Sequence, residues 1–312
     1  MGTKKTEITL DCAYDNYSLL SKDNLNIKKY TNSDITIRSE YNDILNLHND
    51  KKQSTKILFT ENEIYDIDLC RYDEIISIRR VHDLIMLKNI ISVGLNVPQF
   101  YYTSGRLKYL ELLNFDKTYV IKSFLQARSV GKAIVKVDEY LDMCYTSIRS
   151  DITREEFNKR FIKFKGEYRN EHEEYLIYKN ITSAGDFYMQ EYIDVKAEYR
   201  LFYTYGTELK DLILLKRTGY GLTNDITVDN MKTIKIDNPE NILSDSMVSK
   251  FKDLSKLTKL PIMSVDIYED NNGDFGIFEY SPEFSLELDI NTLKQLKTNI
   301  NLGMMNFLKE LI

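Results

Sequence analysis

The sequence predicts an α/β (α+β) protein with several domains, and three observations support this fold class. The chain has 312 residues, 43% of them hydrophobic, so it can bury more than one core. Short apolar runs typical of strands are mixed with longer segments of helical periodicity. Charged residues recur inside the strand-like runs of the second half, where their burial is costly unless a partner, a metal or a ligand compensates.

Residues 1–96 form the predicted N-terminal domain. Residues 1–76 have the pattern of short strands and polar loops, with 56–60 as one strand. A helix is predicted over 81–94, where Gly94 ends the apolar periodicity. An extended linker follows at 95–98, because proline disfavours the helical conformation in the residue before it.

The remainder divides into a central domain, 97–192, and a C-terminal domain, 193–312. The central domain has predicted strands at 118–122, 132–137 and 187–193, and a helix from Arg154 into the Glu171 region. The C-terminal domain has predicted strands at 198–205, 210–217, 262–269 and 274–280, a loop at 218–233, and helices at 244–259 and 286–311. The polar, glycine-containing turn at 269–274 predicts a hairpin.

Charge and cysteine usage exclude several classes of protein. The net charge of −6 and the pI near 5.4 argue against a nucleic-acid binder. The three cysteines are far apart and lack the spacing of a zinc site or a disulfide framework. No apolar run approaches the ~20 residues of a membrane span, and no signal peptide is visible. We therefore expect a cytoplasmic protein without membrane or nucleic-acid partners.

Lys122 and the glutamates of the next strands are candidates for nucleotide contacts. Lys122 ends an apolar strand before a loop, a common position for a phosphate-binding lysine. Glu191 lies in a strand that runs into a linker, and Glu198 follows seven residues later, in reach of ribose hydroxyls. A snorkelling lysine and two solvent-facing glutamates are the simpler explanations, and both stay open.

Cations and carboxylates follow on the later strands. Glu198 and Arg200 are two residues apart and share one face of a strand, while Lys216 and Arg217 end the next strand. Two cations aimed at one point would stabilise a transferring phosphoryl group. A cross-strand salt bridge from Glu198 to Lys216 or Arg217 would explain the same charges without a ligand.

Asp266 and Glu279 lie on the two strands of the predicted hairpin, each flanked by apolar residues. Opposed carboxylates repel unless a cation bridges them. Magnesium binds few carboxylates and completes its coordination with phosphate oxygens and water. The pair therefore predicts a metal site, unless one of the two carboxylates faces solvent.

This order of residues resembles the ATP-grasp superfamily, and within it the peptide carboxylate–amine ligases, including those that add glutamate to a ribosomal protein. The resemblance covers about 80–312 and begins with the helix and the Gly-x-x-x-Pro pattern of 87–98. It implies an ATP-grasp fold in which a central lid domain and a C-terminal domain enclose ATP. The region before residue 80 resembles the variable N-terminal domain of that family.

The resemblance also assigns roles to residues. The implied nucleotide contacts are Lys122, the covering-loop residues Arg128, Ser129 and Gly131, the adenine-hinge residues Gln190, Glu191, Tyr192 and Ile193, and the ribose acid Glu198. The implied catalytic cations are Arg200, Lys216 and Arg217, and the implied metal ligands are Asp266, Glu279 and Ser281. Ser281 stands where the family usually has asparagine, and Asp83 stands near the place of a second nucleotide lysine, with Arg79 and Arg80 just before it.

The implied activity is an ATP-dependent ligation through an acyl phosphate. Its cofactors would be ATP and Mg²⁺, in one or two ions, with Mn²⁺ as a substitute. Its partners would be an amino acid, peptide or protein carboxylate and an amine donor, in a possible homo-oligomer. Macrocyclases of ribosomal peptides, which make ester or amide links, share this architecture. The sequence also allows two different functions, a nucleotide-binding module without turnover and an ATP-grasp phosphotransferase.

Overall fold

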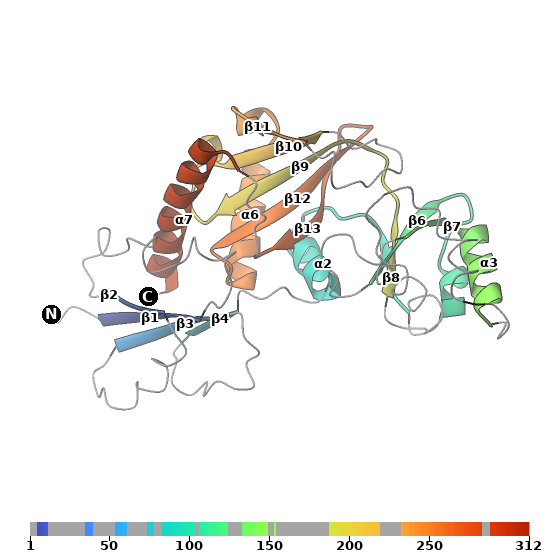
Figure 1. The fold of residues 1–312 in the computed structure, drawn as a ribbon, viewed down its shortest axis with the longest axis horizontal. Helices are drawn as coiled ribbons and strands as arrows, with labels where there is room; N and C mark the ends of the chain where they lie inside the picture. Colours follow the sequence, from blue (N-terminus) through green and yellow to red (C-terminus); the bar gives the residue numbers. More distant parts are fainter. Residues whose placement is uncertain are drawn as a thin grey trace.

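The computed structural model describes residues 5–11, 35–39, 54–60, 74–77, 83–103, 106–123, 133–148, 153, 187–218, 232–282 and 288–311. These residues form three sheets, which Figure 1 shows in succession along the chain. The helix predicted from Arg154, most of the loop predicted at 218–233, and the covering-loop residues Arg128, Ser129 and Gly131 lie outside the described residues.

The N-terminal sheet consists of four parallel strands in the order β2-β1-β3-β4. Its strands are β1 (Lys5–Asp11), β2 (Ile35–Ser39), β3 (Ser54–Thr60) and β4 (Glu74–Ser77). The predicted strand at 56–60 lies within β3, so the strand character expected for this region is confirmed.

Helix α2 (Asp83–Ser92) leads from the N-terminal region to the rest of the molecule. Its buried residues Met86, Leu87 and Ile90 join the core of the C-terminal sheet. The helix is followed by Gly94 at φ 75°, a left-handed conformation that glycine adopts without steric cost. The next residues run along the C-terminal sheet, where the backbone N–H of Ile277 donates to the Asn96 carbonyl at 2.8 Å.

The central sheet is antiparallel, with the order β5-β8-β6-β7. Its strands are β5 (Phe100–Tyr101), β6 (Thr118–Ser123), β7 (Ala133–Lys136) and β8 (Phe187–Glu191). Helix α3 (Val137–Ile148), which the sequence did not predict, and a 3-10 helix (Arg106–Glu111) cover one face. Tyr109, Tyr140 and Phe187 pack together there, with the rings of Tyr109 and Phe187 stacked at 5.0 Å.

The C-terminal sheet has five antiparallel strands in the order β11-β10-β9-β12-β13. They are β9 (Val195–Thr204), β10 (Ile213–Thr218), β11 (Lys232–Ile236), β12 (Ile262–Asp270) and β13 (Phe275–Ser281). The predicted hairpin is confirmed by the pairing of β12 with β13. Strand β11 was not predicted; it is an edge strand, and its described residues are mostly exposed.

Two helices cover opposite faces of the C-terminal sheet. Helix α6 (Asp245–Thr258) begins after Ser244, whose hydroxyl accepts from the Met247 N–H at 3.2 Å. Its Phe251 packs against Tyr203, whereas Gly303 of α7 (Ile290–Leu311) lies close to Thr204. Because neighbouring residues of a strand point to opposite faces, the two helices enclose the sheet between them.

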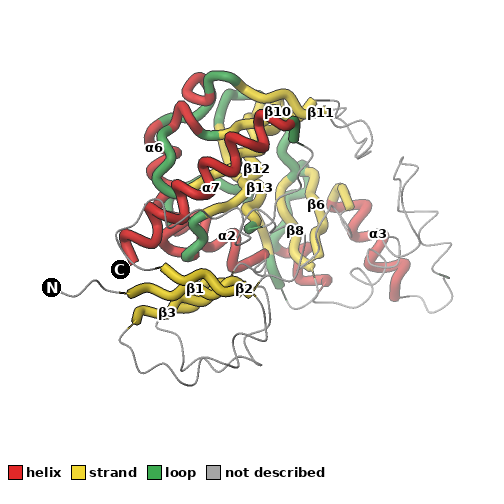
Figure 2. The backbone as a smooth tube through the Cα atoms, turned by 60° about the vertical axis from the view of Figure 1, so that its left-hand side comes forward, coloured by secondary structure: helices red, strands yellow, loops and turns green. Residues whose placement is uncertain are grey.

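The central sheet lies beside the C-terminal sheet in both views, with α3 on its far side (Figure 2). The linker of residues 95–99 and the short segment 192–194 connect the two sheets. No helix among the described residues has the length and apolar character needed to cross a membrane.

Candidate functional site

One face of the C-terminal sheet, here called the site face, brings together five of the predicted residues. Arg200 of β9 pairs directly with Asp266 of β12, and Asp266 pairs with Glu279 of β13. Glu198, two residues before Arg200, pairs with Arg217 of β10. Directly paired residues, and residues two apart on one strand, project from the same face. The sheet register thus gathers side chains that lie up to 81 positions apart in sequence.

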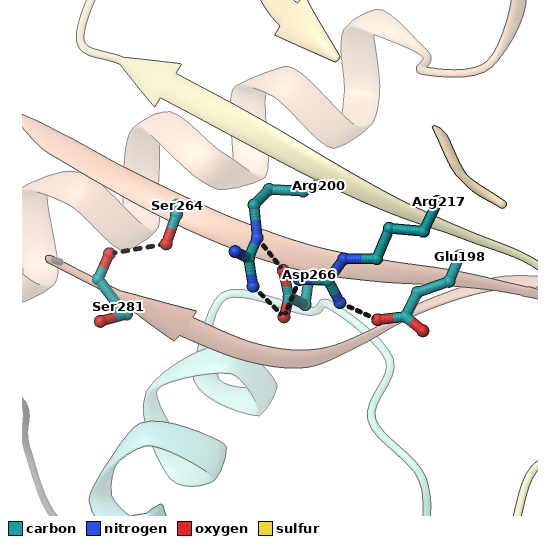
Figure 3. Close-up of polar contacts among 6 residues, drawn as sticks. All are labelled: Glu198, Arg200, Arg217, Ser264, Asp266 and Ser281. Carbon is teal, nitrogen blue, oxygen red and sulfur yellow. Dashed lines mark hydrogen bonds and ion pairs between the residues drawn. The ribbon is translucent and has the colours of Figure 1, made fainter. Parts of the chain in front are cut away.

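Four side chains of the site face, those of Glu198, Arg200, Arg217 and Asp266, form a continuous ion-pair network (Figure 3). Arg200 binds Asp266 with two hydrogen bonds, Nε to Oδ1 at 2.8 Å and a terminal nitrogen to Oδ2 at 2.9 Å. Arg217 contacts Asp266 at 3.1 Å and also donates to Glu198. The salt bridge from Glu198 to Arg217, which the sequence left open as a simpler explanation, is therefore present.

This network is buried at its centre, while the side chains of Arg200 and Glu198 are partly exposed. The side chains of Arg217 and Asp266 are 7% and 9% exposed. Removing two such charges from water carries a penalty that good ion-pair geometry only partly offsets. Such a cluster is therefore weak evidence that these residues serve stability. Its cations and carboxylates are the groups that bind a magnesium–nucleotide complex.

Lys216 does not belong to the site face. It pairs with Tyr199, a residue between Glu198 and Arg200, so it projects from the opposite face of the sheet. On that face it lies close enough to Glu269 to contribute to lowering the pKa of that carboxyl, although the main cause is the hydrogen bond from Lys196. Because Lys216 and Arg217 are neighbours in one strand, their side chains lie on opposite faces of the sheet.

Asp266 and Glu279 stand opposite each other, as the hairpin prediction required. Ser281 lies two residues after Glu279, opposite Ser264, and the Ser264 hydroxyl donates to the Ser281 carbonyl at 3.3 Å. Among the residues that the structure describes, no three His, Cys, Asp or Glu side chains come together as a metal site. Two carboxylates with a nearby serine suit magnesium, which takes its other ligands from phosphate and water.

Lys122 projects from the central sheet toward the C-terminal sheet. Its ammonium donates to the side-chain oxygen of Gln190 on the neighbouring strand and lies 5.8 Å from the centre of the Phe278 ring. Phe278 directly precedes Glu279, so the ammonium lies near the strand that carries the predicted metal ligand. This position agrees with a cation that binds a phosphate near the metal.

The predicted adenine hinge, residues 190–193, connects the central sheet with the C-terminal sheet. The N–H of Glu191 donates to the Gln99 carbonyl at 2.7 Å, and that of Tyr192 donates to the Thr118 carbonyl at 2.9 Å. The Glu191 carboxylate accepts from Lys117 at 2.7 Å and from the Tyr101 hydroxyl at 3.3 Å. Burial and this carboxylate raise the pKa of Tyr101 to about 12.

Two aromatic residues of the site face were missed by the sequence reasoning. Tyr268 pairs with Glu198, and its ring lies 4.6 Å from that of Phe278. The register of β12 and β13 shifts between Asp266 and Ile267, which makes Phe278 an extra residue in a bulge. Burial raises the pKa of Tyr268 to about 12. The only sequence signal for Phe278 is its position before Glu279.

Solved structures resemble this fold over nearly its whole length. The macrocyclase MdnC bound with the precursor peptide MdnA, from Microcystis aeruginosa MRC, has a TM-score of 0.55 at 12% identity, covering 96% of this chain and 99% of that one. The ATP-grasp ligase PsnB complexed with minimal precursor, Mg and ADP has a TM-score of 0.54 at 10% identity, covering 98% and 99%.

A RiPP-associated ATP-grasp ligase from Chryseobacterium gregarium, in complex with ADP and a leader and core peptide, has a TM-score of 0.51 at 11% identity, covering 96% of this chain and 97% of that one. No family model matches the sequence, and no curated protein matches it. The structural likeness confirms the predicted ATP-grasp fold. At 10–12% identity, the fold is all that the likeness shows.

Proposed function

We propose that this protein, which has the ATP-grasp fold, is an ATP- and magnesium-dependent ligase that joins a carboxylate to an amine. The observation that carries the proposal is the site face, where Arg200 and Arg217 bind Asp266, which stands opposite Glu279. Two guanidinium groups beside two opposed carboxylates suit the charges of a metal-bound triphosphate better than they suit a packed core.

The ion pairs of the site face would exchange partners when a nucleotide binds. Arg200 and Arg217 now bind Asp266, and phosphate oxygens offer both arginines the same bidentate geometry. Asp266 and Glu279 would then hold magnesium, which neutralises charge on the phosphates. Lys122 would add a point charge from the central sheet, and Glu198 would accept the ribose hydroxyls. Lys216 has no part in this proposal, because it projects from the other face.

The proposed reaction has two steps. An oxygen of the substrate carboxylate attacks the γ-phosphorus, the bond to the β–γ bridging oxygen breaks, and ADP leaves. The amine nitrogen then attacks the acyl carbon, loses a proton, and phosphate departs with the electron pair of the carbon–oxygen bond. Arg200 and Arg217, which both bind Asp266, would stabilise the charge of the transferred phosphoryl group.

A peptide is the substrate class that we favour for the carboxylate. MdnC, PsnB and the Chryseobacterium ligase are each described in complex with a precursor or with leader and core peptides. The similarity extends along 96–98% of this chain, so it includes more than the nucleotide-binding domains. A macrocyclase that forms ester or amide links within a peptide is accordingly one form of the proposed ligase.

The first test is thermal stability of the full chain with ATP, ADP and GTP, each with and without magnesium. A ligand at about 100 times its dissociation constant adds about 2.7 kcal/mol, which corresponds to several degrees for a protein of this size. We expect magnesium-dependent stabilisation by ATP and a smaller effect in Lys122→Ala. Stabilisation that is absent with every nucleotide would exclude the nucleotide site.

The second test measures ADP and phosphate release with peptides that carry an acidic residue together with a lysine or serine. A cross-link formed within such a peptide is detected by mass spectrometry as the loss of one water. Nucleotide binding without any stimulated phosphate release would instead support a nucleotide-binding module. Release that does not depend on the amine or hydroxyl would support a phosphotransferase.

A further inference from the structure

Gln190 of β8 is a buried amide with partners at both ends. The residue is 1% exposed. Its nitrogen donates to the Pro98 carbonyl at 3.4 Å, and its oxygen accepts from the ammonium of Lys122. Because buried polar groups are costly unless they are hydrogen-bonded, these two contacts fix which end of the amide faces the lysine.

The strand register explains why the two side chains meet. Val120 of β6 pairs with Gln190, and Lys122 pairs with Tyr188. Gln190 and Lys122 are therefore diagonal neighbours on one face of the central sheet. That face turns toward the C-terminal sheet, since the Phe278 ring lies 5.8 Å from the Lys122 ammonium. The ammonium is held between an amide oxygen of its own sheet and an aromatic ring of the other.

The group that accepts the hydrogen bond of Lys122 is a neutral amide, and this affects how well the lysine can bind a phosphate. An amide oxygen orients the ammonium and adds no negative charge to compete with an anionic ligand. The neighbouring residue Glu191 provides the contrast, because it pairs with Tyr119 and projects from the opposite face, where its carboxylate binds the half-exposed Lys117. Strand β8 thus carries glutamine toward Lys122 and glutamate toward Lys117.

Gln190 also connects Lys122 to the linker between the two sheets. Pro98, whose carbonyl accepts from the Gln190 amide, lies between Asn96, which is bonded to β13, and Gln99, which is bonded to β8. Both flanking contacts are backbone hydrogen bonds of 2.8 and 2.7 Å. The position of the Lys122 ammonium is therefore set relative to both sheets that would enclose a nucleotide.

We infer that Gln190 is a positioning residue, whose buried amide aims the ammonium of Lys122 at the phosphates of a bound nucleotide. This inference rests on the proposed function. It gives the side chain of Gln190 a role beside the expected place of this residue in the adenine hinge, because both ends of the amide are bonded to the protein.

A double-mutant cycle on nucleotide affinity tests the inference. Gln190→Met keeps the length of the side chain and removes both hydrogen bonds, and Gln190→Glu keeps its shape and adds a charge beside Lys122. The matched control is Gln295→Met on α7, since Gln295 also accepts from a lysine, Lys235, and donates to a backbone carbonyl, that of Asp211. The dissociation constant of magnesium–ATP is measured by calorimetry, alongside unfolding without nucleotide.

We expect Gln190→Met to weaken ATP binding about tenfold, as loss of a hydrogen bond to a charged group implies, and Gln190→Glu to weaken it further. In the Lys122→Ala background, Gln190→Met should cause no additional loss, because the two residues act as one unit. Gln295→Met should leave ATP affinity unchanged.

Additive losses in the double variant, or unchanged ATP affinity in both Gln190 variants, would overturn the inference and leave the proposed function standing. A chain that binds no magnesium–ATP before any substitution would overturn the proposed function itself. A loss of affinity that is equal in Gln190→Met and Gln295→Met would also count against a specific role, because it would reflect general destabilisation.

Discussion

The guanidinium of Arg217 holds together two carboxylates that lie on different strands. It contacts Glu198 of β9 and Asp266 of β12 from its own position on β10. Lysine at this position would keep the charge but lose the planar fork that reaches both partners. The consequence differs for binding and for chemistry, because a transferred phosphoryl group needs oriented donors more than a bound triphosphate does.

We therefore expect Arg217→Lys to lower kcat for ADP release by more than it weakens magnesium–ATP binding. Steady-state kinetics together with calorimetry would separate the two effects. The control is Lys216→Arg, one residue away on the opposite face, which should change neither quantity by much. Equal losses of kcat and affinity in Arg217→Lys would mean that Arg217 binds only the ground state.

Glu279 is the second predicted metal ligand, opposite Asp266 in the hairpin register. Glu279→Gln removes one negative charge and almost no volume, so we expect the unfolding temperature without ligands to change little. Magnesium-dependent stabilisation by ATP and ligase turnover should both be lost. Glu269→Gln, on the other face of the same hairpin, is the control. Normal turnover in Glu279→Gln would remove this carboxylate from the site.

At the scale of the element, the bulge in β13 places the aromatic pair of the site face. Gly276 lies opposite Tyr268, and an added Cβ at Gly276 would come within 2.2 Å of the Tyr268 hydroxyl oxygen. The Tyr268 ring crosses the strand at that glycine and continues to Phe278, 4.6 Å away. Glycine is required here for close approach and not for its backbone freedom.

Gly276→Ala should accordingly destabilise the protein by about 1–3 kcal/mol, the usual range for overpacking. Chemical denaturation of the full chain measures the change. If the clash with the tyrosine is the cause, the cost should be much smaller when Gly276→Ala is made in a Tyr268→Ala background. The same cost in both backgrounds would point to a backbone effect.

The contact between α6 and α7 has a pH dependence of its own. Glu310 of α7 accepts from Lys256 of α6 at 2.8 Å, and this hydrogen bond is the largest cause that lowers the pKa of Glu310 to about 2. A carboxyl with a lowered folded-state pKa stabilises above its unfolded pKa. That contribution disappears as the pH falls from about 4.5 to about 2.

We expect the unfolding temperature of Lys256→Met to fall less steeply than that of the unsubstituted protein over this acid range, and to differ only slightly at pH 7. Thermal scans at a series of pH values measure both slopes. Parallel slopes would show that the pair contributes nothing to acid sensitivity. Lys250→Met, on the same helix but bonded to a backbone carbonyl, is the control.

At the scale of the whole molecule, a buried hydrogen bond connects the central sheet with α2. The hydroxyl of Tyr188 donates to Asp83 at 3.1 Å. Tyr188 belongs to a strand of the central sheet, yet its side chain is part of the core of the C-terminal sheet. The sequence resemblance places Asp83 near the family's position for a second nucleotide lysine. In the structure, Asp83 instead bonds α2 to the central sheet.

Tyr188→Phe should lower the free energy of unfolding by about 1–3 kcal/mol, the cost of leaving a buried polar group short of a partner. Differential scanning calorimetry would measure the shift. Tyr145→Phe on α3 removes a hydroxyl from an exposed ring and should have almost no effect. An unchanged unfolding temperature in Tyr188→Phe would show that the hydrogen bond between the central sheet and α2 does not stabilise the protein.

Local patterns explain most of the elements that were predicted correctly. The hairpin turn at 269–274 contains Asn-Asn-Gly-Asp, and α6 has a serine cap, so both are specified within a few residues. Helix α3 was missed because strand β7 leads into it without a break. Strand β11 was missed because Ile234 and Ile236 alternate with polar residues over only five positions, a short signal next to the polar loop predicted at 218–233.

The sequence by itself determined the residue types of the candidate site and the fold that holds them, because charges within apolar strands are rare and their order along the chain is distinctive. Only the tertiary structure decided which side chains meet. Sheet register separated Lys216 from Arg217, joined Gln190 to Lys122 and inserted Phe278 beside Glu279. Register depends on pairing between distant strands, and a shift of one residue reverses every face, so no local pattern contains it.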